Sequence, residues 1–147
     1  MQKYMLLIED NPSDEALALR AFKKSSITSD VIVLRDGAQA LEYLLGTGQS
    51  DQELPYVVFL DLKLPKVDGL EVLRRVRAER RTRLLPIVIL TSSNEERDRL
   101  AAYENGANSY ICKPVESAEF SHAVGQLGLY WLDLNQTAPG RVCKSSV

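Results

Sequence analysis

Short apolar runs alternate with longer amphipathic stretches along the whole chain. Five mostly apolar runs predict β-strands at 4–8, 31–34, 56–60, 87–90 and 109–112. Each run is followed by a stretch with helical periodicity, which predicts helices at 13–24, 36–45, 69–79, 95–105 and 116–134. The chain is therefore predicted to consist of five strand–helix units in strict alternation.

The composition of the strands determines the fold class that we expect. Strands that are apolar throughout are buried on both faces, as in a parallel sheet between two layers of helices. Because parallel connections are right-handed, we expect an α/β fold with a doubly wound, five-stranded parallel sheet in the order 2-1-3-4-5. One domain is predicted over 3–134, and a flexible tail over 135–147 because that segment lacks an apolar pattern.

Composition and charge exclude several classes of protein. The chain has 18 Lys plus Arg against 20 Asp plus Glu, so its net charge of −2 gives no general attraction to nucleic acid or anionic membrane. No run approaches the roughly 18 apolar residues of a membrane span. With two cysteines and no signal-peptide pattern, the chain is predicted to be cytoplasmic. Six arginines in 74–83 are predicted to form a solvated helix face, since no aromatic residues are interleaved with them.

Three acidic residues follow strands that this topology places side by side. Glu9 and Asp10 come after the first predicted strand, and Asp61 comes after the third. Ligands of such sheets bind at the carboxyl ends of the strands, where the strand order reverses. Two like charges ~4 Å apart repel by about 4 kcal/mol at an effective dielectric constant of ~20, so the cluster needs a cation. Oxygen ligands suit Mg²⁺, and no His or Cys lies nearby in sequence to favour zinc.

The fourth and fifth strands also end in polar residues. Thr91 closes the fourth strand, and Lys113-Pro114 follows the fifth. Each residue alone has an ordinary explanation, because a strand-terminal acid often caps the next helix and Lys-Pro is often a turn. Their joint placement at the ends of the central strands indicates a functional site.

These motifs resemble the receiver domain of two-component response regulators. The resemblance rests on Glu9-Asp10, on Asp61 followed by Leu-Lys-Leu-Pro and Asp68-Gly69, on Thr91-Ser92, and on the segment from Tyr110 to Pro114. It extends from residue 3 to about residue 134 and implies a flavodoxin-like fold. It also implies a signalling protein rather than an enzyme. Such a protein accepts a phosphoryl group from a sensor histidine kinase and signals by a conformational switch and protein–protein contact.

The resemblance assigns a role to each acidic residue. Asp61 is implied as the phosphoacceptor, with its carboxylate as the nucleophile. Asp10 is implied to bind Mg²⁺ directly, and Glu9 directly or through water. Asp61 and the backbone carbonyl of Lys63 complete the protein ligands.

Further residues are implied to bind the phosphoryl group and to respond to it. Lys113 bridges to a phosphoryl oxygen, and Thr91 donates its hydroxyl group. Thr91 and Tyr110 form the implied switch pair, while Lys63 and Ser93 flank the position of attacking water and tune the lifetime of the phosphoryl group. The Lys113-Pro114 bond is implied to be cis.

The last predicted helix indicates how the signal leaves the domain. Its core-facing positions recur at a spacing of four and three, at Phe120, Val124, Leu127, Trp131 and Leu134. Leu129 and Leu132 fall off this stripe and, with Trp131, are predicted to form a homodimer or partner face. The helix length, Trp131-Leu132 and the 46–55 loop resemble the small response regulators of bacterial and cyanobacterial phytochrome kinases, which implies a phytochrome partner.

Three other classes of protein remain as alternatives. A phosphatase of the haloacid-dehalogenase type also uses an Asp after a parallel strand, but needs a second Asp where this chain has Lys63. A flavodoxin-like nucleotide or flavin binder needs a phosphate-binding loop after the first strand, where this sequence is acidic and lacks glycine. A receiver that acts only as a scaffold usually lacks a site residue, and here none is missing.

Overall fold

The computed structural model describes residues 3–46, 53–113 and 117–139. The strands are β1 (Tyr4–Ile8), β2 (Asp30–Leu34), β3 (Val57–Leu60), β4 (Ile87–Thr91) and β5 (Ser109–Cys112). The helices are α1 (Pro12–Lys24), α2 (Gly37–Leu45), α3 (Gly69–Ala78), α4 (Glu96–Glu104) and α5 (Ser117–Leu129), followed by a π-helical turn, η1 (Tyr130–Leu134). The five predicted strand–helix units are confirmed, and apart from the last helix their ends differ from the prediction by at most one residue.

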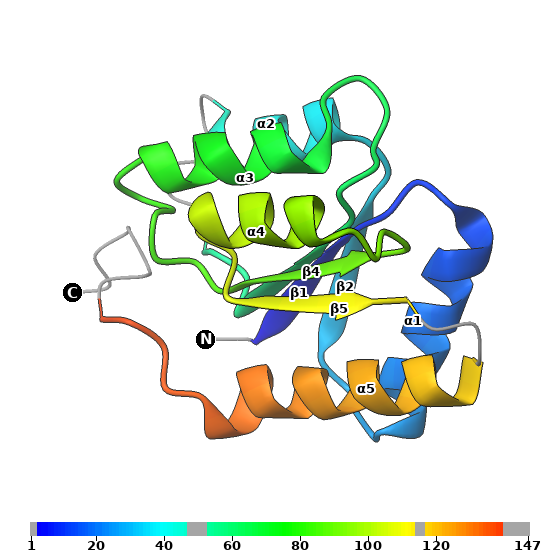
Figure 1. Cartoon of the computed structure of the whole chain (residues 1–147). Helices are drawn as coiled ribbons and strands as arrows, with labels where there is room; N and C mark the ends of the chain where they lie inside the picture. The colour runs from blue at the N-terminus through cyan, green and yellow to red at the C-terminus, as the bar shows by residue number, and fades with distance from the viewer. Residues whose placement is uncertain (1–2, 47–52, 114–116, 140–147) are drawn as a thin grey trace.

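The strands form one parallel sheet in the order β2-β1-β3-β4-β5, as predicted. Helices α2, α3 and α4 cover one face of the sheet, and α1 and α5 cover the other (Figure 1). Side chains of a strand alternate between these two layers. In β1, Leu6 and Ile8 pack into the core under α2, α3 and α4, whereas Met5 and Leu7 pack against α1 and α5. The order places β1 and β3 together at the centre of the sheet.

Polar residues that follow the strands begin the next helices. The side chain of Asn11 accepts hydrogen bonds from the backbone N–H groups of Ser13, at 2.9 Å, and Asp14, at 3.1 Å. Asp68 caps α3 in the same way, through the N–H of Glu71 at 2.9 Å. These bonds satisfy N–H groups that the first turn of a helix leaves free. The caps also fix the direction in which α1 and α3 leave the sheet.

The arginines of 74–83 divide between the solvent and the protein interior. Arg74 pairs with Glu71 on the exposed face of α3, in agreement with the predicted solvated face. Arg77 differs, because its guanidinium group donates to the backbone oxygen of Gly106 and to Asn108 Oδ1, each at 2.9 Å. Burial lowers the pKa of Arg77 from its usual value. Arg77 therefore joins α3 to the loop before β5, a structural role that the sequence pattern did not indicate.

The predicted last helix ends in a different geometry, and this corrects the predicted partner face. Helix α5 stops at Leu129, and the chain continues as the π-helical turn η1, in which Asn135 N–H donates to Tyr130 O at 2.7 Å. A π-turn contains one more residue than an α-turn, so the residues after it are rotated about the helix axis. Leu132 is consequently buried, with 4% of its surface exposed, whereas the predicted core residue Leu134 is 75% exposed.

Leu132 therefore does not belong to the partner face, and Leu134 does not belong to the core stripe. Leu129 and Trp131 are half-buried. Leu132 and Trp131 pack in the core between the sheet and the α1–α5 layer. Of the three residues predicted for the partner face, only Leu132 is excluded by its burial, and Leu129 and Trp131 stay predictions.

The last described residues lie near the amino ends of β3 and β4. Ala138 and Pro139 line, with Leu54 and Pro86, a cavity of about 470 Å³ just before β3 and β4.

No helix within 3–46, 53–113 or 117–139 is both long and apolar enough to cross a bilayer. The Lys113-Pro114 bond, most of the 46–55 loop and the tail after residue 139 lie outside the described residues.

The π-helical turn can be tested by comparing two leucines. Leu132→Ala is expected to lower the free energy of unfolding by about 2–5 kcal/mol, because it leaves a cavity in the core. Leu134→Ala should change it by less than about 0.5 kcal/mol, because Leu134 is exposed. Urea denaturation followed by tryptophan fluorescence measures both. A larger loss for Leu134→Ala would mean that the α-helix continues to residue 134 as the sequence predicted.

Candidate functional site

The backbone of the sheet positions the residues at the strand ends. Pairing to the neighbouring strand continues one residue beyond β1, β3 and β5. The backbone N–H of Glu9 donates to the oxygen of Leu34 at 2.9 Å, and that of Asp61 donates to the oxygen of Ile8 at 3.1 Å. The N–H of Lys113 donates to the oxygen of Thr91 at 2.7 Å. Because the sheet itself fixes these backbone atoms, the three side chains converge at its carboxyl edge.

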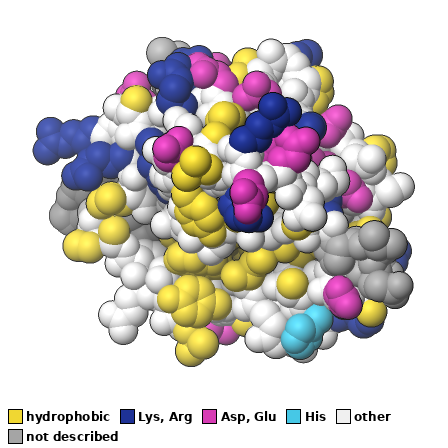
Figure 2. All heavy atoms as spheres, in the orientation of Figure 1, with side chains coloured by type: hydrophobic (Ala, Val, Ile, Leu, Met, Phe, Trp, Pro, Cys, Tyr) yellow, Lys and Arg dark blue, Asp and Glu magenta, His cyan; other side chains and the backbone are white. Residues whose placement is uncertain are grey.

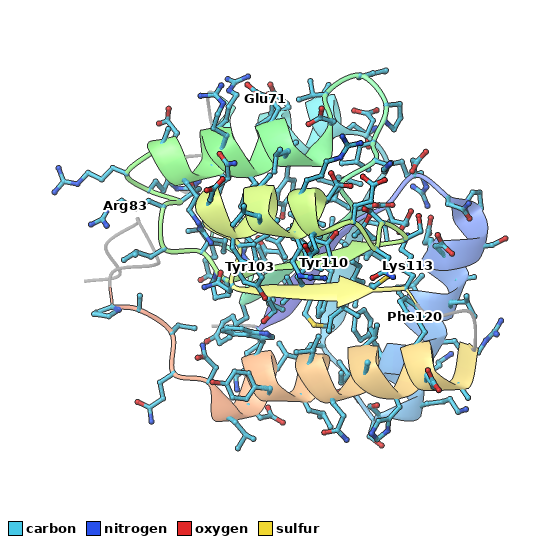
Figure 3. All side chains as sticks on the ribbon, viewed as in Figure 1. Glu71, Arg83, Tyr103, Tyr110, Lys113 and Phe120 are labelled. Atoms are coloured by element: carbon cyan, nitrogen blue, oxygen red, sulfur yellow. The ribbon has the colours of Figure 1, made fainter. Side chains whose placement is uncertain are left out.

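A single ammonium group forms the centre of the site. Lys113 Nζ donates to Glu9 Oε1 at 2.7 Å, to Asp14 Oδ2 at 2.8 Å and to Asp61 Oδ2 at 3.1 Å. The side chains of Lys113, Glu9 and Asp61 are at most 10% exposed, so these contacts are shielded from water. Figure 3 shows Lys113 at the carboxyl end of β5, beyond Tyr110 on the same strand.

Burial and neighbouring charge shift the acid–base equilibria of this centre. Burial, together with the negative charge of Asp61, raises the pKa of Glu9 to about 7, although the hydrogen bond from Lys113 opposes this shift. Burial alone would lower the pKa of Lys113. Its hydrogen bonds to Asp14 and Glu9 and the charge of Asp61 outweigh that effect and raise the pKa of Lys113 above its usual value.

The loop after β3 packs tightly around Asp61. Asp61 Oδ1 accepts a hydrogen bond from the N–H of Lys63 at 3.2 Å. A β-carbon at position 69 would lie 2.1 Å from the carbonyl oxygen of Asp61, so only glycine allows α3 to start this close. The loop reaches this position through Lys66, whose φ of 71° lies in the left-handed region. The motif Asp68-Gly69 thus consists of a helix cap and a close backbone contact beside Asp61.

Three acids at this edge have the geometry of a cation site. Glu9, Asp10 and Asp61 each offer a carboxylate oxygen, and these oxygens lie within 4.8 Å of one another. Asp10 is exposed, whereas Glu9 and Asp61 are buried. Carboxylate oxygens with an open, solvated side suit a hard divalent cation that keeps part of its water shell. The residues present therefore fit the metal that the sequence predicted, and Lys63 as a carbonyl ligand stays a prediction.

The predicted switch residues meet through Ser93. Thr91 is completely buried, and its Oγ1 accepts a hydrogen bond from the N–H of Ser93 at 3.3 Å. The hydroxyl group of Tyr110 donates to the backbone oxygen of Ser93 at 3.2 Å. Burial raises the pKa of Tyr110, which keeps its hydroxyl group protonated as this contact requires. The backbone of one residue therefore connects the two side chains.

Asp14 also belongs to the charged centre, a role that the sequence pattern alone does not establish. It lies in the first turn of α1, directly after the acidic end of β1. An acid three residues after the helix cap Asn11 could indicate such a role, because the first turn of α1 starts beside the strand ends. A first-turn acid is also common for helix-dipole reasons alone, so the sequence did not distinguish the two roles.

The comparison with known families identifies the class of protein. The model of the response regulator receiver domain matches residues 5–125, which is most of the chain. The chain therefore belongs to this family, and its members are signalling proteins. This result confirms the predicted resemblance.

Similar proteins match over nearly their whole length. A probable methanogenesis regulatory protein, FilR2 of Methanothrix harundinacea, is 41% identical over 92% of this chain and 87% of its own. Response regulator Rcp1 of Synechocystis is 35% identical over 89% of this chain and 90% of its own. The crystal structure of Mn²⁺-bound Rcp1 superposes with a TM-score of 0.84 and covers 92% of this chain and 99% of its own. The crystal structure of the phosphorylated cyanobacterial phytochrome response regulator RcpA superposes with a TM-score of 0.85 at 31% identity. It covers 93% of this chain and 99% of its own.

The raised pKa of Glu9 predicts pH-dependent metal binding. Protonated Glu9 is a poor ligand, so affinity for Mg²⁺ should fall as the pH drops through about 7, the pKa of Glu9 in the folded chain. Calorimetry should give a dissociation constant about tenfold higher at pH 6 than at pH 8. Glu9→Gln has no proton to exchange at this position and should bind weakly with little change over this range. An equally steep pH dependence in Glu9→Gln would assign the titrating group elsewhere.

Proposed function

We propose that this chain receives a phosphoryl group on Asp61 from the phosphohistidine of a sensor histidine kinase. The observation that carries this proposal is the position of Asp61, whose carboxylate accepts a hydrogen bond from the ammonium group of Lys113 and lies close to carboxylate oxygens of Glu9 and Asp10. A carboxylate oxygen of Asp61 forms the new bond to phosphorus as the phosphorus–nitrogen bond breaks. The histidine leaves with the bonding electrons and takes up a proton.

Charge on the transferring oxygens is met by groups that the fold holds in place. Glu9, Asp10, Asp61 and the carbonyl of Lys63 would hold Mg²⁺, which would supply positive charge to those oxygens. Lys113 donates to Asp61 Oδ2 from the carboxyl end of β5. Such preformed electrostatic stabilisation is the main contribution that proteins make to phosphoryl transfer.

The proposed switch uses the contacts of Thr91 and Tyr110. A phosphoryl group adds about −1.5 to −2 charge beside the end of β4 and attracts the hydroxyl group of Thr91. Movement of Thr91 disturbs the N–H of Ser93, whose carbonyl oxygen holds Tyr110. A charge change at the site therefore reaches the surface near α4 through the backbone of one residue.

The alternative of a dehalogenase-type phosphatase is less well supported. That chemistry needs a second acid two residues after the nucleophile. Here the position is Lys63, and its contact with Asp61 is made by the backbone N–H. The phosphoryl group on Asp61 is accordingly proposed to leave slowly, by attack of water, rather than by acid-assisted turnover.

We propose a phytochrome kinase in the cytoplasm as the phosphate donor. The high structural similarity to RcpA, a cyanobacterial phytochrome response regulator, supports this assignment. FilR2, a probable regulator of methanogenesis, is a relative of comparable coverage, so a kinase with another input is the alternative. Phosphotransfer from a purified phytochrome kinase in red and far-red light would distinguish the two.

We propose further that the chain forms a homodimer through the face made by α4, β5 and α5. Hydrophobic side chains gather on this face in Figure 2. Its most exposed large apolar residues are Leu100 and Tyr103 on α4 and Tyr130 and Leu134 on η1. Burying such a side chain contributes about 1.5–3 kcal/mol, so several of them can support a modest interface. These residues extend the predicted face, from which the buried Leu132 is removed.

Phosphorylation can be tested directly by intact mass. Acetyl phosphate with Mg²⁺ should add one phosphoryl mass to the wild type and none to Asp61→Asn, whose neutral amide replaces the nucleophilic carboxylate. A chelator should reduce labelling of the wild type by at least about tenfold, because the metal stabilises the transferring charge. Labelling of Asp61→Asn at the wild-type level would refute the assignment of the phosphoacceptor.

The proposed dimer face can be tested with a charged double variant. Leu100→Asp/Tyr103→Asp should shift the dissociation constant of the dimer upward by about tenfold or more, because it introduces charge into an apolar contact. Leu84→Asp is the control, since Leu84 is similarly exposed but lies before β4, where it lines the cavity with Leu54 and Pro86. Light scattering over a concentration series, with and without phosphodonor, gives the result. A wild type that stays monomeric at high micromolar concentration in both states would rule out the dimer.

A further inference from the structure

We propose that Asp14 is a positioning residue that holds Lys113 when a divalent cation occupies the neighbouring carboxylates. The proposal rests on the metal site and phosphoacceptor proposed above and assigns a function to a residue outside both. Asp14 lies on α1 and Lys113 just beyond β5, and their side chains meet at 2.8 Å.

The hydrogen bonds of Lys113 are fully used in this structure. An ammonium group has three protons, and those of Lys113 are directed to Glu9, Asp14 and Asp61. The contacts to Glu9 and Asp14 are the shorter two, and the contact to Asp61 is the longest at 3.1 Å. Lys113 is therefore drawn toward the β1–α1 side of the site.

A bound metal would compete with Lys113 for two of these three partners but not for the third. Glu9 and Asp61 belong to the group of carboxylates whose oxygens converge for a cation, and Asp14 does not. A cation bound by Glu9 and Asp61 would compete with Lys113 for the same two carboxylates and would repel its positive charge. Asp14 is the partner that Lys113 does not share with the metal. It allows both positive charges to remain beside Asp61, as phosphoryl transfer requires.

The local structure holds Asp14 in this position. Its backbone N–H is bound by the side chain of the cap residue Asn11 at 3.1 Å, which fixes the first turn of α1. The carboxylate is 30% exposed, compared with 3% for Glu9. Asp14 therefore keeps its contact with water at the rim while the buried acids exchange partners.

Glu15 offers a matched control. It lies in the same turn of α1 and carries the same charge, but its carboxylate pairs with Arg35 at 2.9 Å. Glu15→Gln removes one negative charge from the first turn of α1, as Asp14→Asn does, so both variants weaken the general attraction of this helix end for a cation equally. Glu15→Gln leaves the contacts of Lys113 intact.

The experiment is a calorimetric titration of the full chain with MgCl₂ at pH 8, without phosphodonor. Asp14→Asn should raise the dissociation constant of Mg²⁺ about tenfold, because Lys113 then competes harder for Glu9 and Asp61. Glu15→Gln should change it by less than about twofold. Asp14→Glu, which keeps the carboxylate, should recover most of the affinity.

A double variant tests whether Asp14 acts through Lys113. In a Lys113→Met background, adding Asp14→Asn should change the affinity by no more than Glu15→Gln does. Wild-type affinity in Asp14→Asn, equal losses in Asp14→Asn and Glu15→Gln, or a full loss in the Lys113→Met background would each overturn the proposal. These titrations contain no phosphodonor. Failure of Asp61 as phosphoacceptor would appear only in the mass measurement and would leave this result interpretable.

Discussion

The triple contact of Lys113 with carboxylates is the interaction on which the site depends. It joins three segments that are distant in sequence, namely the β1–α1 turn, the end of β3 and the end of β5. Removing one partner from a buried ion pair leaves an uncompensated charge and typically costs about 3–5 kcal/mol. The acids can therefore be assembled at the carboxyl edge only because a cation is built into the same place.

This arrangement leaves the buried acids in competition. Glu9 keeps a raised pKa even with an ammonium group at 2.7 Å, because burial and the charge of Asp61 outweigh that contact. A site that balanced its charges completely would have little affinity for an added cation or phosphoryl group. The negative charge that Lys113 leaves unbalanced lowers the stability of the fold, and it is consistent with a site that binds a cation and a phosphoryl group.

The fold and most of the site follow from local features of the sequence. Apolar runs such as 57–60 have no polar face, so they require a sheet covered on both sides, and strict alternation then places Glu9 and Asp61 at one edge. Other features depend on three-dimensional detail that a pattern does not contain. Whether Asp14 reaches Lys113 depends on how α1 is rotated against the sheet. The burial of Leu132 depends on a single extra residue in the last turn.

A parallel sheet separates its two edges by function. The loops at the carboxyl edge carry the charged centre, and their geometry is restricted by contacts as close as that of Gly69 with Asp61. Lys3 precedes β1 at the opposite edge, and Pro139 lies there against Leu54 and Pro86. Both ends of the described chain therefore lie away from Asp61. A fused domain, a fluorescent label or a surface tether could be attached at either end without entering the space that a kinase must reach.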